Sequence, residues 1–376
     1  MKNKNNKIGI VTFPISEAGV KPLSNLVRIF SSISGEIYLI TGGAGYTALA
    51  NNKQVHTYRV EHSVGAHHTF TRVINYVKTQ VKISIKLLAL RKRVDIWFFF
   101  IGAEGLILPI LTSKLLRKKV VIASAGSGTK SAEAANDTLA GSLALLQAFT
   151  YHLSDRIILY SNGLIEEHNL QKYMFKITFA HEQFLDFNLF KVAVKLAKRD
   201  NLVGYIGRLS EEKGILNFMK AIPNILNDKH EYHFLIGGDG QLRNEIEKYS
   251  NEHNLTGKVN LTGWISHDKL PQYLNELKLI ILPSYTEGLP NIMIEAMACG
   301  TPVLANAVGA IPVYIKDGET GFLLANNSPE CITQSIIKVL NHPDLTQIAN
   351  NGRILVEKEF TFEKASARYR EILNTL

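Results

Sequence analysis

Short apolar runs alternate with longer amphipathic segments along the chain. A run of about four to eight apolar residues without polar alternation is typical of a parallel strand that is buried on both faces. Such runs predict strands at residues 7–13, 36–41, 54–60, 95–101, 119–123, 202–207, 232–237, 259–262 and 279–282. Strands that alternate with helices in both halves of the chain predict an α/β fold with two Rossmann-like domains.

The length of the chain also favours two domains. A sequence of 376 residues exceeds what one hydrophobic core usually supports. Residues 191–200 are charged and lack a strand pattern, so they are the natural linker. We therefore expect a first domain at residues 1–192, a second domain at residues 200–359, and an aromatic-rich terminal helix at residues 360–376.

One long helical pattern covers residues 70–93. Lys78, Lys82 and Lys86 share one face, and a second face is apolar. The apolar face is formed by Val77, Val81, Ile85 and Leu88. Two interpretations stay open: an ordinary surface helix with a solvated lysine face, or a helix that lies on a membrane surface.

The most informative stretch is residues 279–304, which predicts a strand, a loop and a helix. Pro290 suits the first turn of that helix and Gly300 suits its exit. The free N–H groups of a helix start, here those of Gly288, Leu289 and Asn291, attract anions. Glu287 in the loop and Glu295 in the helix would accept hydrogen bonds from hydroxyls. Phosphate together with hydroxyls describes a nucleotide sugar, whereas a capped helix with a surface glutamate is the plainer alternative.

Basic residues follow another expected strand, at residues 202–207. Arg208 and Lys213, with Gly214 opening a helix, have the arrangement of an anion clamp. The glycine-rich turn at residues 237–240 would let a ligand approach the backbone, although such turns are common.

Charge is unevenly distributed between the two halves. Residues 1–200 contain 26 Lys and Arg against 13 Asp and Glu, a net of +13, whereas residues 201–376 contain 16 against 20, a net of −4. The basic half is expected to meet an acidic partner.

Several classes of protein are excluded or disfavoured. The two cysteines, Cys299 and Cys331, argue against a disulfide scaffold and lack metal-ligand spacing. The polar start, residues 1–7, is not expected to be a signal peptide. The apolar region at residues 96–112 contains Glu104 and interrupting glycine and proline residues, so it is expected to be a strand and a helix and not a membrane span. No G-x-G-x-x-G follows the first strand, which disfavours a nicotinamide dehydrogenase.

The sequences Glu-Gly-Leu-Pro at residues 287–290 and Glu-Ala-Met-Ala-Cys-Gly-Thr-Pro-Val at residues 295–303 resemble the signature of family-four retaining glycosyltransferases of GT-B fold, the glycosyl transferases group 1. The resemblance extends over most of residues 200–376. It implies two Rossmann-like domains that face a central cleft, with a C-terminal helix crossing back to the first domain. It also makes residues 151–161 the last strand of the first domain.

The same resemblance implies an activity and a set of site residues. The family transfers a hexose-type sugar from a nucleotide-diphosphate sugar with retention and without a metal or other cofactor. Arg208 and Lys213 would neutralise the diphosphate, Glu287 would hold the donor sugar, and Glu295 would hold the ribose. The catalytic residues would be Glu287, Arg208 and Lys213, and the donor-binding residues would be Gly19, Gly207, Arg208, Lys213, Gly238, Ile265, Glu287, Gly288, Leu289, Pro290, Asn291 and Glu295.

This sequence departs from the family in the first domain. Many relatives carry a histidine in the loop at residues 124–129, where this chain offers only hydroxyls such as Ser127 and Thr129. Another departure, at residues 179–184, contains His181, which is a candidate acceptor-site residue or a structural histidine. A nucleotide-sugar epimerase of the same fold and an inactive nucleotide-sugar-binding subunit therefore remain alternatives.

The expected partners follow from charge and family. They are a nucleotide-sugar donor, a glycan or lipid-linked acceptor of the cell surface, and an anionic membrane surface; no nucleic-acid partner is expected. The expected location is the cytoplasm, peripherally on the inner face of the membrane. The sequence does not name the sugar, the base, the acceptor, the linkage or the oligomeric state.

Overall fold

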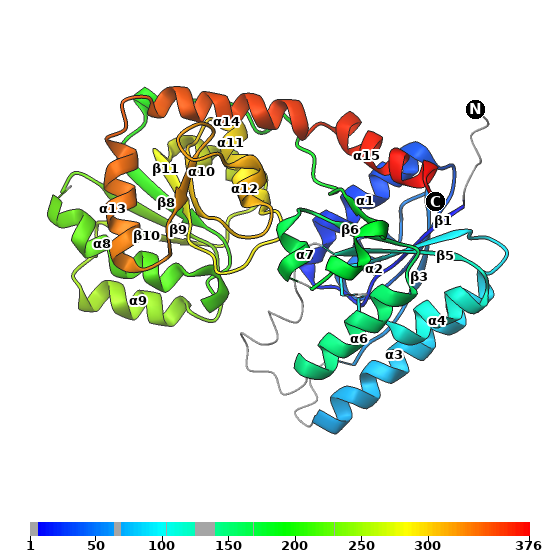
Figure 1. Ribbon diagram of the computed structural model, residues 1–376. Helices are drawn as coiled ribbons and strands as arrows, with labels where there is room; N and C mark the ends of the chain where they lie inside the picture. The colour runs from blue at the N-terminus through cyan, green and yellow to red at the C-terminus, as the bar shows by residue number, and fades with distance from the viewer. Residues whose placement is uncertain (1–6, 64–68, 103, 125–139, 168, 229) are drawn as a thin grey trace. The chain divides into compact units, whose positions relative to one another are not determined.

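The computed structural model describes residues 7–63, 69–102, 104–124, 140–167, 169–228 and 230–376 (Figure 1). The chain divides into two compact units. Unit 1 comprises residues 1–184 and 362–376, and unit 2 comprises residues 185–361. Each unit is a parallel sheet with flanking helices, as the alternation of apolar runs and amphipathic segments predicts.

Unit 1 is built on a seven-stranded parallel sheet of order β3-β2-β1-β4-β5-β6-β7. The strands are β1 (Ile8–Val11), β2 (Ile37–Thr41), β3 (Val55–Arg59), β4 (Ile96–Phe100), β5 (Lys119–Ser124), β6 (Arg156–Leu159) and β7 (Ile177–Phe179). Every residue of the central strands β1, β2 and β4 is buried, which explains their uninterrupted apolar character.

The helices of unit 1 include one from the end of the chain. They are α1 (Val20–Ile33), α2 (Ala44–Leu49), α3 (Thr69–Ala89), α4 (Ile107–Leu115), α6 (Ala140–Leu153), α7 (Gly163–Glu167) and α15 (Phe362–Asn374). Helix α15 packs against α1, where the ring of Tyr369 meets Phe30 edge to face at 5.4 Å. The terminal helix therefore returns to the first domain, which confirms the expectation from the family resemblance.

Unit 2 is built on a six-stranded parallel sheet of order β10-β9-β8-β11-β12-β13. The strands are β8 (Leu202–Ile206), β9 (His233–Gly237), β10 (Val259–Gly263), β11 (Leu279–Leu282), β12 (Val303–Asn306) and β13 (Phe322–Leu324). The helices are α8 (Ile215–Asp228), α9 (Arg243–Glu252), α10 (Leu270–Glu276), α11 (Asn291–Ala298), α12 (Ile311–Tyr314), α13 (Pro329–Leu340) and α14 (Leu345–Glu359).

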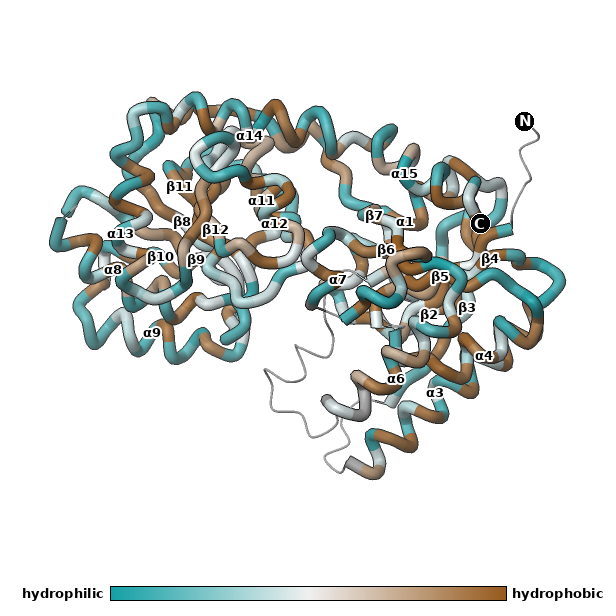
Figure 2. The backbone as a smooth tube through the Cα atoms, in the orientation of Figure 1, coloured by the Kyte–Doolittle hydropathy of each residue, from teal (hydrophilic) through white to brown (hydrophobic). Residues whose placement is uncertain are grey.

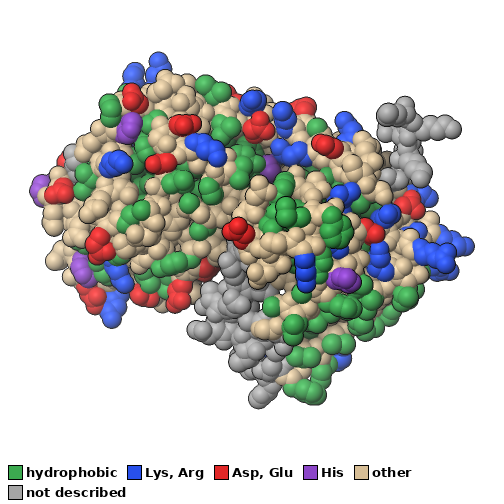
Figure 3. All heavy atoms as spheres, viewed as in Figure 1, with side chains coloured by type: hydrophobic (Ala, Val, Ile, Leu, Met, Phe, Trp, Pro, Cys, Tyr) green, Lys and Arg blue, Asp and Glu red, His purple; other side chains and the backbone are tan. Residues whose placement is uncertain are grey.

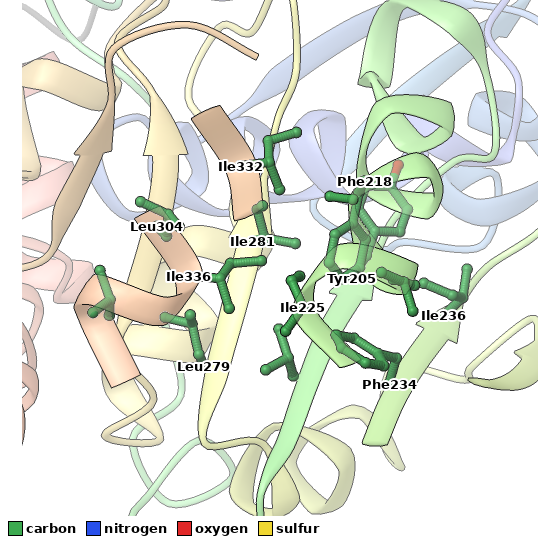
Figure 4. Packing of buried hydrophobic residues seen from close by; sticks show 14 of the residues in the cluster. Tyr205, Phe218, Ile225, Phe234, Ile236, Leu279, Ile281, Leu304, Ile332 and Ile336 are labelled. Atoms are coloured by element: carbon green, nitrogen blue, oxygen red, sulfur yellow. The ribbon is translucent and has the colours of Figure 1, made fainter. Parts of the chain in front are cut away.

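The core of unit 2 lies between its sheet and two adjacent helices (Figure 4). Phe218 of α8 packs edge to face on Phe234 of β9, with ring centroids 6.0 Å apart. Ile332 and Ile336 of α13 belong to the same cluster and are fully buried. Figure 2 shows the resulting pattern in unit 2, in which strands such as β8 and β11 are hydrophobic and the helices alternate between hydrophobic and hydrophilic residues.

The boundary between the units differs from the sequence-based expectation. It falls at Phe184 and Leu185, and not within residues 191–200. The backbone N–H groups of Ala193 and Val194 donate to Asn275 Oδ1 at 2.7 and 3.2 Å. The charged segment is therefore attached to unit 2 and does not act as a free linker.

Arg199 makes this attachment strong. Its guanidinium is buried and donates to the carbonyl oxygens of Val194, Leu274, Leu277 and Cys299 and to Thr301 Oγ1. Burial lowers the pKa of Arg199 to about 10. A charged stretch that resembles a linker in sequence is thus folded around one buried cation.

The last strand of the first domain was also misplaced by the sequence analysis. The strand expected within residues 151–161 is β6, which covers only Arg156–Leu159, and β7 follows it at the sheet edge. β7 is only three residues long and half-exposed or exposed, so it lacks the apolar run that marks the other strands.

Candidate functional site

Strand order predicts a ligand site at one point in unit 2. The chain begins the sheet at β8, proceeds outward through β9 and β10, and then returns to the other side of β8 with β11. Ligands of open parallel sheets bind outside the carboxyl ends of the strands where the order reverses. The two loops that meet there are residues 207–214 after β8 and residues 283–290 after β11.

These two loops are joined by an ion pair. Lys213 Nζ lies 2.7 Å from Glu287 Oε1, and both side chains are mostly buried. Ser284 Oγ donates to the same oxygen at 2.8 Å, and Ser284 itself is 1% exposed. Both hydrogen bonds fall on Oε1, so Glu287 Oε2 has no hydrogen bond to any residue that the structure describes. The carboxylate is therefore held in one orientation with one oxygen available.

Local backbone contacts bring Lys213 to this position. Lys213 ends a short 3₁₀ helix, Glu211–Lys213, and Gly214 follows with a φ of +66°. A Cβ at Gly214 would lie 2.1 Å from the carbonyl oxygen of Pro283. Only glycine allows this approach of the two loops. Asn327 fixes the second loop, because its Nδ2 donates to the Pro283 carbonyl at 3.1 Å.

Arg208 lies in the same loop but is more exposed. Its Nη1 is 3.5 Å from Glu212 Oε1, and its side chain is 61% exposed. Exposed pairs of this kind contribute about 0–1 kcal/mol, so Arg208 can leave Glu212 for an incoming anion. The two predicted cations are thus held differently, with Lys213 in a short, mostly buried ion pair and Arg208 in a longer, more exposed one.

The structure adds a glycine that the sequence analysis missed. Gly309, after β12, has a φ of +57°, and a Cβ there would lie 1.9 Å from the carbonyl oxygen of Glu287. Ala310 N–H donates to the Gly288 carbonyl at 2.7 Å. The loop that carries Glu287 is therefore supported by a segment more than twenty residues later in the chain. The only sign of this segment in the sequence is the tripeptide Val308-Gly309-Ala310.

Gly207, Gly238 and Ile265 lie at the carboxyl ends of β8, β9 and β10. Gly238 has a φ of +123°, and a Cβ there would lie 1.9 Å from the Gly207 carbonyl oxygen. Ile265 lies against Gly237, whose added Cβ would meet Ile265 Cδ1 at 2.6 Å. These glycines allow the strand-end loops to pack closely. Their contact with a donor stays a prediction.

The helix start predicted after Glu287 is present as α11. Leu289 and Pro290 are buried, Pro290 precedes the first helical residue, and Asn291 begins the helix. Gly300 ends the helix region with a φ of +66°, as its sequence position predicts. From the sequence, Pro290 is expected in the first turn of the helix, but it lies one position before the helix, because its ψ of 121° is extended and not helical.

Glu295 is held by a residue that the sequence analysis did not assign. His267 Nε2 lies 3.0 Å from Glu295 Oε1, and the glutamate side chain is only 3% exposed. His267 comes from the loop between β10 and α10, and its ring packs edge to face on Phe190 at 5.1 Å. Spacing alone could not reveal this pair, since His267 lies in a loop after β10 and Glu295 lies in helix α11.

Gly19, the predicted donor-binding residue in the first half of the chain, belongs to unit 1. It lies in the loop after β1, directly before α1, and its backbone approaches Ile15. A Cβ at Gly19 would meet the Ile15 side chain at 3.0 Å, which is a packing reason for glycine. Its predicted approach to the donor stays a prediction.

Two carboxyl groups of unit 1, the fully buried Glu182 and the partly exposed Glu104, have a raised pKa. Burial raises the pKa of Glu104 and of Glu182 to about 7 each. Glu104 Oε2 accepts a hydrogen bond from Gln147 at 2.9 Å, and Glu182 Oε2 accepts one from Tyr160. His181 is also buried, and its pKa is lowered well below its usual value by burial and by Arg368.

This burial favours the structural interpretation of His181 over the acceptor-site interpretation. Ser127 and Thr129, the hydroxyls suggested in place of the family histidine, lie outside the described residues. Within the described ranges, no group of three or more His, Cys, Asp and Glu side chains could hold a metal ion.

The chain is similar to known glycosyltransferases. The family model for glycosyl transferases group 1 matches residues 186–354. Among curated proteins, alpha-D-kanosaminyltransferase of Streptomyces kanamyceticus is 28% identical over 203 residues, which are 51% of this chain and 53% of that protein. The capsular polysaccharide biosynthesis glycosyltransferase CapM of Staphylococcus aureus is 30% identical over 184 residues, 48% of each chain. The chain thus spans about half the length of the curated relatives it matches.

Solved structures share the architecture of both units. HepE of Anabaena, in complex with UDP and glucose, has a TM-score of 0.74 at 17% identity and covers 98% of this chain and 99% of its own. Sucrose-phosphate synthase of Thermosynechococcus elongatus has a TM-score of 0.75 at 18% identity, covering 98% of this chain and 100% of its own. At these identities the likeness shows the fold, which is the two-domain α/β fold expected from the sequence.

Proposed function

We propose that the chain is a retaining glycosyltransferase with a nucleotide-diphosphate sugar as donor, because residues 186–354 match the family model for glycosyl transferases group 1 and the chain has the GT-B fold. The observation that carries the proposal is the Lys213–Glu287 pair at the point where the strand order of unit 2 reverses. A cation for phosphate and a carboxylate for hydroxyls occur there side by side. HepE is solved with UDP and glucose, which supports the same class of donor here.

The cations would act on the leaving group. As the bond between the sugar and the diphosphate breaks, negative charge grows on the phosphate oxygens. Lys213 and Arg208 would stabilise that charge, and stabilisation of charge that develops in the transition state is what lowers the barrier. One ammonium hydrogen of Lys213 is used by Glu287, which leaves two for phosphate oxygens. Activity would then need no divalent metal.

The glutamates would bind hydroxyls. Glu287 Oε2 is the available oxygen for donor-sugar hydroxyls, since Lys213 and Ser284 occupy Oε1. Glu295 would accept a hydrogen bond from the ribose, and His267, whose Nε2 lies 3.0 Å from Glu295 Oε1, would orient the carboxylate. The N–H groups of Gly288 and Asn291, just before and at the start of α11, would donate to phosphate.

Retention would follow from attack on the same face that the diphosphate leaves. The bond from the acceptor oxygen to the sugar carbon forms as the bond to phosphate breaks, and the acceptor proton moves to a phosphate oxygen. Glu287 is paired with Lys213 and would serve as a hydrogen-bond acceptor and not as a nucleophile. A pair of carboxylates of the glycosidase type is not needed in this scheme.

The acceptor is proposed to be a lipid-linked or cell-surface glycan. CapM acts in capsular polysaccharide biosynthesis by its name, which supports this class. The net charge of +13 over residues 1–200 supports a peripheral location on an anionic cytoplasmic membrane surface.

Product analysis tests the proposal. The purified chain is incubated with a panel of nucleotide-diphosphate sugars and a cellular glycolipid extract, and products are identified by mass spectrometry. Transfer of the sugar with release of nucleoside diphosphate is expected. Isomerised donor without transfer would indicate an epimerase, and donor binding without turnover would indicate a binding subunit; either result would contradict the proposal.

A further inference from the structure

Helix α3 of unit 1 exposes an apolar stripe along its length. The stripe consists of Phe70, Val73, Val77, Val81, Ile85 and Leu88, with exposures from 42% for Val73 to 77% for Phe70. Spacings of three or four residues place these side chains on one face of the helix. A surface helix normally turns polar side chains toward water. The apolar face expected from the sequence is therefore present, but it points outward.

The opposite face of α3 fixes this orientation. Thr79 and Gln80 are buried together with Ile83 and Leu87. Gln80 Oε1 accepts from the N–H of Leu108 at 3.0 Å, which ties α3 to the start of α4. The helix thus buries amide and hydroxyl groups while it exposes six large apolar side chains. A rotation of α3 that buried the stripe would break the hydrogen bond between Gln80 and Leu108.

Neighbouring helices extend the exposed apolar surface. Leu108 and Leu115 of α4 are 39% and 83% exposed, and Leu145 and Phe149 of α6 are 75% and 45% exposed. Helix α4 contacts both α3 and α6. Figure 3 shows hydrophobic side chains gathered over these three helices. We name these four residues and the stripe together the α3 face; an apolar surface of this extent marks an interaction site.

Positive charge borders the α3 face on one side. Lys78, Lys82 and Lys86 each follow a stripe residue by one position, so they form a row beside it. Helix α3 contains no Asp or Glu. A pocket of about 320 Å³ opens next to the row and is lined by Arg59, Glu61, Lys82, Ile85 and Lys86. Three cations against one carboxylate suit a phosphate group, and Ile85 belongs to both the pocket and the stripe.

We propose that the α3 face inserts into an anionic lipid bilayer, and that the adjoining pocket receives the phosphate of a lipid headgroup. An amphipathic helix in the interface buries its apolar side about 5–10 Å deep, while lysines beside it reach the headgroups. A protein partner or a second copy of this chain would also cover apolar side chains, but neither explains a cationic row and pocket along the stripe. No helix in the described ranges is long and apolar enough to span a bilayer.

This inference deepens the proposed function and rests on it for its purpose, which is access to a lipid-linked acceptor. It differs from attachment by charge alone. A second basic cluster in the first half of the chain consists of Lys114, Arg117, Lys118 and Lys119. It is partly neutralised, because Lys114 pairs with Asp155 at 2.9 Å and Lys118 with Asp95 at 3.7 Å. Apolar insertion is therefore assigned the larger share of binding, and binding should persist when salt screens the charges.

Vesicle flotation tests the assignment. Full-length protein is mixed with vesicles of phosphatidylcholine and phosphatidylglycerol, or of phosphatidylcholine alone, at salt from about 0.1 M to about 1 M. Wild type should float with anionic vesicles and keep a measurable bound fraction at high salt. The variant with Val77→Ser, Val81→Ser and Ile85→Ser should lose at least tenfold in partitioning at every salt concentration. Lys82→Gln with Lys86→Gln should lose binding chiefly at low salt.

Matched controls come from unit 2. Val313 and Ile354 are exposed apolar side chains there, so Val313→Ser with Ile354→Ser removes similar surface outside the α3 face. This variant should float like wild type. All substituted positions are exposed except Lys86, which is half-buried, and thermal unfolding checks that each variant is folded. Size-exclusion chromatography with light scattering, without lipid, checks for self-association.

Three outcomes would overturn the inference. The first is that folded wild-type protein does not float with any vesicle, and the second is that salt abolishes flotation while the serine substitutions leave it unchanged. The third is that wild type is a dimer, which the serine substitutions convert to a monomer without a change in flotation. Nucleoside-diphosphate binding measured without lipid reports on unit 2 separately. A chain that binds donor but not vesicles would contradict only the α3 assignment, and one that binds vesicles but not donor would contradict only the proposed function.

Discussion

Lys213 Nζ lies 2.7 Å from Glu287 Oε1, although 74 residues separate the two in the chain. The contact joins the loop after β8 to the loop after β11, which are adjacent strands of the sheet. It is mostly shielded from water, and Ser284 supports the same carboxylate oxygen. A charged pair so placed needs an explanation beyond stability, since buried ion pairs are weak contributors to folding. A polar ligand with phosphate and hydroxyl groups provides one.

The two glutamates should fail in different ways. Glu295→Ala should weaken the binding of nucleoside diphosphate, because its carboxylate is proposed to hold the ribose. Glu287→Ala should leave that affinity within about twofold and lower sugar-dependent turnover by on the order of 10². Calorimetric titration and initial rates measure the two effects. Tight nucleoside-diphosphate binding by the Glu295 variant would reject the ribose role.

Activity should be independent of divalent metal. Lys213 and Arg208 are proposed to supply the positive charge that a metal provides elsewhere, and the sequence has no Asp-x-Asp motif. Turnover should be the same with EDTA and with added magnesium or manganese. Loss of turnover in EDTA that either metal restores would show that the two cations are insufficient.

Much of this site could be predicted from sequence because its signals are local. Leu279–Leu282 is a buried strand bounded by Pro283, and Gly300 ends the following helix region, as the residue pattern indicates. The support from Gly309 and the His267–Glu295 pair could not be predicted, because each joins segments that are distant in sequence and meet only after the sheet forms.

The errors in the fold have equally specific causes. Residues 191–200 look like a linker by charge, yet Arg199 is buried against four carbonyl oxygens and a hydroxyl. The strand β7 is too short to carry an apolar run. For α3 the sequence shows an apolar face but does not show that Thr79 and Gln80 occupy the buried side.

Replacing Arg199 should destabilise unit 2. Arg199→Lys cannot satisfy the separate acceptors that the guanidinium fork reaches, and buried acceptors without donors are costly. We expect a loss of about 3 kcal/mol in the free energy of unfolding. Lys198→Ala, an exposed neighbour, is the control and should change it by less than about 0.5 kcal/mol. Equal unfolding curves for the two variants would show that Arg199 does not anchor the segment.

Stability of unit 1 should fall as pH rises from about 5 to 8. Burial raises the pKa of Glu182 to about 7, against the opposing effects of the Tyr160 hydrogen bond and of Arg368. Between the unfolded value of 4.5 and about 7, the folded chain keeps a proton that the unfolded chain has released. The contribution of protonated Glu182 to the free energy of unfolding is therefore fully present at low pH and is lost as pH rises through the folded pKa. The loss is roughly 3 kcal/mol for a fully buried group.

Glu182→Gln isolates this contribution. The amide keeps an acceptor for Tyr160 and cannot ionise, so the variant should be more stable than wild type at pH 8 and show a shallower pH dependence. Glu104, whose pKa burial also raises to about 7, supplies the remaining slope. Urea unfolding, followed by the fluorescence of the buried Trp97, measures the free energy of unfolding at each pH. Glu17→Gln, at an exposed position, is the control. An unchanged slope in the Glu182 variant would contradict the assignment.

The most direct measurement for the donor site is the rate of nucleoside-diphosphate release with and without Lys213. Wild type is first screened for the nucleotide-diphosphate sugar that it turns over, and the same rate is then measured for Lys213→Ala, Arg208→Ala and the control Lys220→Ala. Lys220 is an exposed lysine of α8 outside the site. We predict a loss of on the order of 10² or more for the first two variants, equivalent to about 3 kcal/mol of transition-state stabilisation, with folding intact and the control unaffected. Wild-type turnover in a folded Lys213→Ala variant would contradict the assignment of the donor site.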